Sequence, residues 1–304
     1  MKKREIIEGV IKDYDFPNKG SFELDGKKVI MKGALPGQKV SCMVSKVRKD
    51  KAEARLLDVL ERSEIEDAVP PCPQFGICGG CAYQTMSYEH QLELKAGQVK
   101  KLLDGVIDSE AHPYEWEGII GSPVTTAYRN KMEYSFGDEY KDGPLVLGLH
   151  KKNSMYDIVP VCNCVIVSED YNRIVSYTME FARKHGLSYH KKMQHVGLLR
   201  HLVLRQSKTN GGLLVNLVTS TDGLENLDLK AYVEGLLALP LDGMIIGILH
   251  TANDSLADAV VPEKVTLLYG RDYIEEEVLG LHFRISPFSF FQTNTKSAER
   301  LYSK

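Results

Sequence analysis

The sequence lacks a long apolar run and a secretory signal, and these absences exclude two broad classes of protein. No segment approaches the roughly 18 apolar residues of a membrane-spanning helix, and the most apolar one, at 244–249, has the length of a strand. The basic start, Met1-Lys2-Lys3-Arg4-Glu5, is not followed by the apolar region of a signal peptide. We therefore expect a cytoplasmic protein with no membrane contact.

Internal repeats and low-complexity segments are also missing, and the composition is that of an ordinary globular chain. Of its 304 residues, 43% are hydrophobic and 26% are charged, which excludes disordered, collagen-like and disulfide-scaffold proteins. The net charge of −3 hides an asymmetry: residues 1–62 hold 15 Lys and Arg against 10 Asp and Glu, and the remainder 23 against 31. This division predicts a basic N-terminal module on a mildly acidic body.

The basic module has the pattern of a small β-barrel. Residues 1–62 contain about five short strands separated by turn residues such as Asp25-Gly26 and Leu35-Pro36-Gly37. Such a pattern predicts a five-stranded OB-like barrel, a common platform for single-stranded nucleic acid. Lys46 and Arg48, on the last hairpin, are candidate RNA contacts. The alternative is a purely structural barrel with solvated lysines.

Beyond an acidic, proline-containing boundary at 61–71, helical and strand patterns mix, which predicts an α+β chain. We expect helices at 87–103, 169–184 and 227–239. We expect strands at 131–136, 145–150, 196–207, 212–219, 242–251, 265–269 and 281–285.

Six cysteines form the most informative pattern. Cys72, Cys78 and Cys81 have the spacing C-x5-C-x2-C, with Gly79-Gly80 inside it, and Cys162 and Cys164 follow far along the chain. Four thiolates suit structural zinc or an iron–sulfur cluster, and a compact triplet with one distant cysteine favours [4Fe–4S] over the paired knuckles of zinc sites. Cys42, in a barrel strand, is expected to be a small core residue.

Several segments together resemble the RNA (uracil-5-)-methyltransferase family along the whole chain. They are Cys78-Gly79-Gly80-Cys81-Ala82-Tyr83-Gln84, Tyr128-Arg129-Asn130-Lys131, Leu199-Arg200-His201 with Arg205, and Ser286-Pro287-Phe288-Ser289-Phe290-Phe291-Gln292-Thr293-Asn294. The branch most similar carries a [4Fe–4S] cluster and methylates 23S ribosomal RNA.

This resemblance implies a fold in three parts. Residues 1–62 would form an RNA-holding TRAM barrel, 63–280 a mixed α/β central domain with the cluster, and 281–304 the start of a Rossmann-like methyl-donor domain that is otherwise absent. The cluster ligands would be Cys72, Cys78, Cys81 and Cys164, with Cys162 the open alternative for the fourth.

The resemblance also assigns roles to other residues. Gln292 would contact S-adenosylmethionine, and Phe291, with Phe290, would lie near the target base. Arg129, Lys131, Arg200, His201 and Arg205 would contact RNA. The competing interpretation is that the basic residues lie on the solvent-facing side of their strands. One phenylalanine would then pack in the core, and His201 would be a structural residue.

In this family a cysteine thiolate adds to C6 of uracil, C5 takes the methyl group, and a base then removes the C5 proton. We find no glycine-rich donor loop and no suitable nucleophile among the six cysteines, and therefore expect a fragment that is inactive alone. We also expect the chain to be a monomer. A tRNA-specific enzyme and a non-catalytic RNA-binding protein with a structural metal site are the alternatives.

Overall fold

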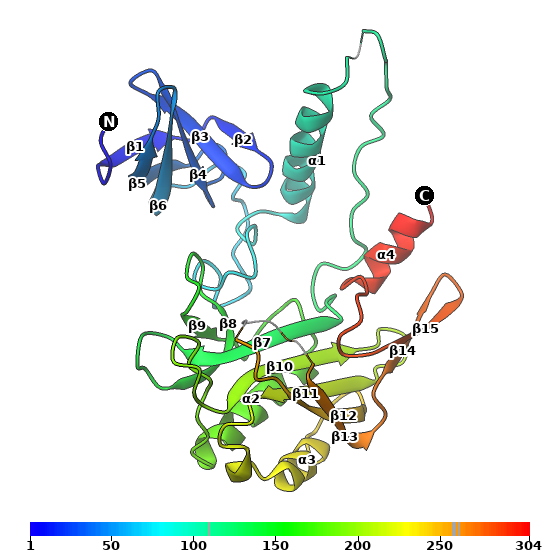
Figure 1. The fold of residues 1–304 in the computed structure, drawn as a ribbon. Coiled ribbons are helices and arrows are strands. Elements are labelled where there is room, and N and C mark those ends of the chain that lie inside the picture. The colour runs from blue at the N-terminus through cyan, green and yellow to red at the C-terminus, as the bar shows by residue number, and fades with distance from the viewer. Residues whose placement is uncertain (109, 257–259, 261) are drawn as a thin grey trace. The chain divides into compact units, whose positions relative to one another are not determined.

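The computed structural model of the protein describes residues 1–108, 110–256, 260 and 262–304, and these divide into two compact units (Figure 1). The first unit comprises Met1–Pro70 and Ala82–Gly121, and the second comprises Pro71–Cys81 and Ser122–Lys304. This division differs from the predicted segments 1–62, 63–280 and 281–304, because residues 82–121 group with the N-terminal strands.

The first unit is built on a six-stranded sheet. Its strands are β1 (Ile6–Val10), β2 (Asp13–Asp15), β3 (Lys19–Leu24), β4 (Lys27–Lys32), β5 (Lys39–Val47) and β6 (Lys51–Glu61), in the order β1-β5-β6-β4-β3-β2. The expected number was about five. The difference arises at Ile11 and Lys12, which separate β1 from β2 and whose N–H groups bond to Gln38 and Ser21. One continuous segment thus supplies both end strands.

Local sequence explains how this sheet packs. Asp25 and Gly26, between β3 and β4, both have positive φ (51° and 69°), as the predicted tight hairpin requires. A Cβ at Gly9 would lie 2.3 Å from the ring of Phe22, so glycine here lets that ring enter the core. Cys42 is fully buried in the same cluster, as predicted.

Helix α1 (Tyr88–Asp104) completes the first unit and matches the helix predicted at 87–103. Ser87 caps it, with its Oγ accepting a hydrogen bond from the His90 N–H. Near its other end, Lys101 forms an ion pair with Asp15 of β2 at 2.5 Å. Only Gln98 is buried within the helix.

The second unit contains a seven-stranded sheet. Its strands are β7 (Lys131–Asp138), β8 (Leu145–His150), β9 (Ile158–Pro160), β10 (Leu199–Gln206), β11 (Leu213–Thr219), β12 (Ile245–Ala252) and β13 (Lys264–Gly270), in the order β13-β12-β11-β10-β7-β8-β9. Only β11 and β12 pair in parallel among these, because η1 (Leu224–Asn226) and α3 (Leu229–Leu237) cross over between them.

Helices α2 (Glu169–Lys184) and α3 cover one face of this sheet (Figure 1). Their apolar side chains, among them Ile174, Phe181 and Leu236, share one core with Leu202 and Leu217 of the strands. Burying each such side chain contributes about 1.5–3 kcal/mol. The mixed α+β architecture with several sheets is thus confirmed.

A C-terminal segment follows this sheet. Strands β14 (Ile274–Val278) and β15 (Leu281–Ile285) form a hairpin, and α4 (Thr295–Tyr302) ends the chain. Glu276, 1% exposed, accepts hydrogen bonds from the N–H of Lys208 (2.9 Å) and from Thr295 Oγ1 (3.2 Å), which joins the hairpin to β10–β11 and α4. Within the described part of the chain, no helix is long and apolar enough to cross a membrane.

Candidate functional site

The loop that carries three of the predicted ligand cysteines lies against the end of β8. The N–H of Gly79 donates to the His150 carbonyl at 2.9 Å, the N–H of Lys152 donates to the Ile77 carbonyl at 2.7 Å, and Cys78 forms a bridge with Lys151. A Cβ at Gly79 would lie 3.1 Å from the His150 oxygen, so glycine permits this close approach.

The distal cysteine is positioned by the start of α2. The N–H of Cys164 donates to Asn172 Oδ1 at 3.0 Å, and its side chain is buried, whereas Cys162 is exposed. Burial raises the pKa of the Cys164 thiol, a hydrogen bond from the Ile166 N–H to its sulfur opposes this, and Cys72, Cys81 and Cys78 raise it further. Of the two candidates for fourth ligand, Cys164 is the buried one, and it belongs to the core cluster against which Cys78 and Cys81 pack.

Cys78 has a similar environment. Burial raises its pKa, the N–H of Gly80 donates to its Sγ at 3.3 Å, and Cys72 adds a repulsive contribution. None of the six cysteines forms a disulfide.

Four thiols, with N–H groups directed at two of them, are the residue type that binds four-thiolate metal groups. Among residues 1–108, 110–256, 260 and 262–304, however, no group of three or more His, Cys, Asp or Glu side chains has a geometry that could hold a metal ion. The predicted [4Fe–4S] site therefore stays a prediction.

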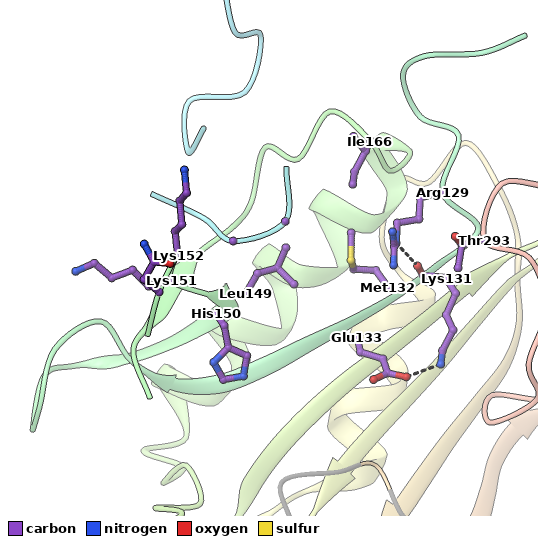
Figure 2. Close-up of a pocket in the computed structure, with 13 residues that line it drawn as sticks. Arg129, Lys131, Met132, Glu133, Leu149, His150, Lys151, Lys152, Ile166 and Thr293 are labelled. Carbon is purple, nitrogen blue, oxygen red and sulfur yellow. Dashed lines mark hydrogen bonds and ion pairs between the residues drawn. The ribbon is translucent and has the colours of Figure 1, made fainter. Parts of the chain in front are cut away.

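A cavity of about 650 Å³ lies beside the cysteine loop (Figure 2). Gly79 and Gly80 line it together with the predicted RNA-contacting residues Arg129 and Lys131. Arg129 Nε donates to the Lys131 carbonyl at 2.9 Å, and the Lys131 ammonium pairs with Glu133. Two residues that the sequence interpretation missed, Lys151 and Lys152, also line the cavity. The sequence feature that could have identified them is their position as a lysine pair directly after the strand predicted at 145–150.

Arg200 and Arg205, predicted to contact RNA, are buried at 4% and 1% exposure. Arg200 Nη1 donates to the carbonyls of Asn253 (2.6 Å) and Ser255 (2.8 Å). Arg205 donates from Nε to the Pro287 carbonyl at 3.1 Å and from Nη2 to the Ser289 carbonyl, and burial lowers its pKa. Both guanidinium groups thus hold the backbone of neighbouring loops instead of presenting charge at the surface.

His201 is also buried, and its Nδ1 lies 3.4 Å from Ser135 Oγ, as a structural histidine would. Lys46 and Arg48 lie exposed at the end of β5 and just beyond it, where Arg48 is 3.6 Å from Glu53. These two residues belong to the first unit, and the other predicted contacts belong to the second.

The Phe-Phe-Gln segment lies between β15 and α4. Phe291 packs against Phe283 (ring centroids 5.6 Å apart) and an apolar cluster, whereas Phe290 is 88% exposed. Gln292 is exposed, and its backbone carbonyl accepts a hydrogen bond from Asn130 Nδ2 at 2.9 Å. Asn130 Nδ2 also donates to Thr295 Oγ1 at 2.9 Å, a positioning role that the sequence interpretation did not assign.

No protein-family model matches the chain. An uncharacterized RNA methyltransferase of Clostridium acetobutylicum is 48% identical over all of this chain and 65% of its own length. One from Caldanaerobacter subterraneus subsp. tengcongensis is 45% identical over all of this chain and 66% of its own length. From end to end, this chain is similar to RNA methyltransferases. It spans about two thirds of the length of these relatives.

A solved structure has the same fold. The Pyrococcus abyssi tRNA (uracil-54, C5)-methyltransferase in complex with S-adenosyl-L-homocysteine matches with a TM-score of 0.69 and 25% identity, over 97% of this chain and 63% of its own. The similarity to RNA methyltransferases therefore extends from sequence to architecture.

Proposed function

We propose that this chain is part of an RNA (uracil-5-)-methyltransferase that uses S-adenosylmethionine to methylate C5 of a uridine in 23S ribosomal RNA. What supports this proposal is the similarity of the whole chain to RNA methyltransferases, together with the burial of Cys164 in the core cluster against which Cys78 and Cys81 pack. The resemblance associates this cysteine set with the ribosomal branch.

The four cysteines would hold a [4Fe–4S] cluster. Burial and the neighbouring cysteines favour the protonated form of the Cys164 and Cys78 thiols. On binding the cluster each cysteine would lose its proton, and the positive charge of the iron would offset the repulsion between the four thiolates. Methylation of uracil requires no electron transfer from this group, so its role would be structural. It would join the 72–81 loop to the segment at Cys164.

The sheet of the first unit would be the OB-like TRAM barrel. In the strand order β1-β5-β6-β4-β3-β2, the two end strands β1 and β2 are neighbours in sequence. The two edges of the sheet are therefore formed by one nearly continuous segment, as in a closed barrel. Lys46 and Arg48, exposed at the β5–β6 end, would attract the phosphate backbone of RNA.

In the second unit, Arg129 and Lys131 would contact RNA, and Gln292 would contact the methyl donor. The exposed ring of Phe290 is the better candidate for the wall of a flipped uracil, because Phe291 is packed against Phe283. Arg200 and Arg205 are left out of the RNA surface because their guanidinium groups are buried and bound to carbonyls. We also assign His201 no RNA contact.

A tRNA substrate is the second candidate, and the structural match to a tRNA (uracil-54, C5)-methyltransferase favours it. Deleting the gene from its host and measuring 5-methyluridine in purified rRNA and tRNA by mass spectrometry tests both candidates. We expect loss of one 5-methyluridine from 23S rRNA. Loss from tRNA alone would support the second candidate, and unchanged levels in both RNAs would contradict the proposal.

A further inference from the structure

The cavity beside the cysteine loop has a charge distribution suited to an anionic ligand. Four cationic side chains line it, Arg129, Lys131, Lys151 and Lys152, against one carboxylate, Glu133. Figure 2 shows the lysine pair at one end and Arg129 with Lys131 at the other. Glu133 pairs with Lys131 at one end and Asp157 lies 4.0 Å from Lys151 at the other, so each end keeps a net positive charge, from Arg129 and from the lysine pair.

The floor of the cavity is apolar. Leu149 and Met132 lie between the two cationic ends in Figure 2, and Ile166 lines the cavity as well. A volume of about 650 Å³ falls in the range of roughly 300–1,000 Å³ that is typical of small-ligand sites. An apolar floor between cationic ends suits a group that has a flat uncharged face and a charged phosphate, which is the chemistry of a nucleotide.

The cysteine loop holds the lysine end in place. Backbone contacts join the cysteine loop to the residues at the end of β8. The N–H of Gly79 donates to the His150 carbonyl, and the N–H of Lys152 donates to the Ile77 carbonyl. Cys78 and Lys151 form a β-bridge between them. Lys151 also lies 4.0 Å from Asp157, a surface pair that contributes little. The backbone of the lysine pair is therefore preorganised by the loop.

We infer that this cavity is a subsite for one unpaired nucleotide of the RNA substrate, with its base over Leu149 and Met132 and its phosphate at Lys151 and Lys152. The inference rests on the proposed function, because it takes RNA as the ligand. It adds a recognition element, distinct from the target uridine, whose position depends on the cysteine loop. A duplex cannot supply such a nucleotide, since its bases are paired and stacked.

The test compares two double variants of the full chain, K151A/K152A and the control K184A/K264A. Lys184 and Lys264 are exposed cations of the same unit, on α2 and β13, so both variants lose the same charge. Binding of a fluorescent single-stranded RNA is measured by anisotropy over a series of salt concentrations. We expect K151A/K152A to bind about tenfold more weakly near physiological salt and to lower the slope of log K against log salt by about 1.4. The control should change neither.

The outcomes separate this inference from the proposed function. If the unaltered chain binds no RNA, the proposed function fails with it. If it binds RNA but the two double variants weaken binding equally, the subsite is wrong and the proposed function stands. Binding of a duplex of the same length as tightly as the single strand would also overturn the assignment to an unpaired nucleotide.

Discussion

At the scale of single residues, burial decides whether a cation is available to a ligand. The Arg205 guanidinium is enclosed and bonded to loop carbonyls, whereas Arg129 lines a cavity. A buried charge is tolerated only when it is well hydrogen-bonded. The Pro287 and Ser289 carbonyls accept hydrogen bonds from Nε and Nη2 of Arg205, whereas its buried Nη1 has no hydrogen-bond partner among the described residues.

We expect Arg205→Met to destabilise the second unit by about 1–3 kcal/mol, because the two carbonyls lose their buried donors. Denaturant unfolding, followed by hydrogen exchange of the β10 amides, measures the change. Lys131→Met is the comparison: this side chain, 22% exposed, pairs with a partly exposed Glu133, and its loss should change the free energy of unfolding by less than about 0.5 kcal/mol. Unfolding of Arg205→Met at the same denaturant concentration as the unaltered protein would refute the structural role.

At the scale of elements, the segments that matter are held by a few specific contacts. The cysteine loop is anchored on β8 by backbone bonds, and α1 is joined to β2 through the Lys101–Asp15 pair. Neither element is buried deeply enough for hydrophobic packing alone to set its position. Each is therefore sensitive to the chemistry of its contacts.

The first element-scale prediction concerns the fourth cysteine. Protein purified without oxygen should be brown and contain iron and sulfide. Cys164→Ser should abolish both, because it removes the buried thiol near Cys72, Cys78 and Cys81. Cys162→Ser is the matched control and should keep its colour, since that side chain is exposed. The opposite pattern would make Cys162 the ligand, and a colourless unaltered protein that contains zinc would exclude the cluster.

The second element-scale prediction concerns how the stability of the contact between Asp15 and Lys101 depends on pH. The hydrogen bond from Lys101 lowers the pKa of Asp15, so the unfolded state binds its proton more tightly than the folded state. The stabilisation is fully present above the ordinary aspartate pKa of about 3.9 and is lost as the pH falls through the lowered folded value. Because Asp15 is 36% exposed, we expect less than about 1 kcal/mol.

Hydrogen exchange of the α1 amides at about pH 6 and about pH 3 measures this effect. Exchange should accelerate at the lower pH beyond its intrinsic change, and Asp15→Asn should remove most of that difference. Asp58→Asn, which alters a carboxylate on β6, is the control. Equal pH dependence in the Asp15→Asn and unaltered proteins would show that the ion pair does not hold the helix.

At the scale of the whole molecule, we expect none of the six cysteines to be the nucleophile that adds to uracil. Burial raises the pKa of Cys42 to about 11, which disfavours the thiolate, and Cys72, Cys78, Cys81 and Cys164 lie near one another. Cys162 is exposed and adjoins that group. Methyl transfer needs a thiolate that is both accessible and activated.

We therefore expect the purified 304-residue chain to transfer no methyl group from labelled S-adenosylmethionine to uridine-containing RNA. Incorporation of label into rRNA or tRNA transcripts, measured against a protein-free blank, is the assay. The same sample should still bind single-stranded RNA, which shows that it is folded. Label incorporation that Cys162→Ser abolishes would identify the nucleophile and refute the expectation.

Much of the secondary structure followed from local patterns. The strand at 145–150 and the helix at 169–184 coincide with β8 and α2, because alternation and amphipathic spacing are properties of neighbouring residues. The C-x5-C-x2-C spacing likewise marked Cys72, Cys78 and Cys81 as a group. Strand β9 was missed because its three residues are too few to show a period. Strand β14 was missed because its inward-facing central residue is Glu276, so its three consecutive glutamates show no apolar alternation.

The sequence by itself determined the α+β class, the basic N-terminal module and the candidate residue types of the site. Only the tertiary structure decided which of those residues lie close together and which are buried. It buried Cys164 in the core cluster against which Cys78 and Cys81 pack and left Cys162 exposed. It also buried Arg200 and Arg205, and it placed Lys151, Lys152 and Gly79 around one cavity. The physical reason is that burial and charge environment depend on contacts between segments far apart in the chain, and no local pattern records them.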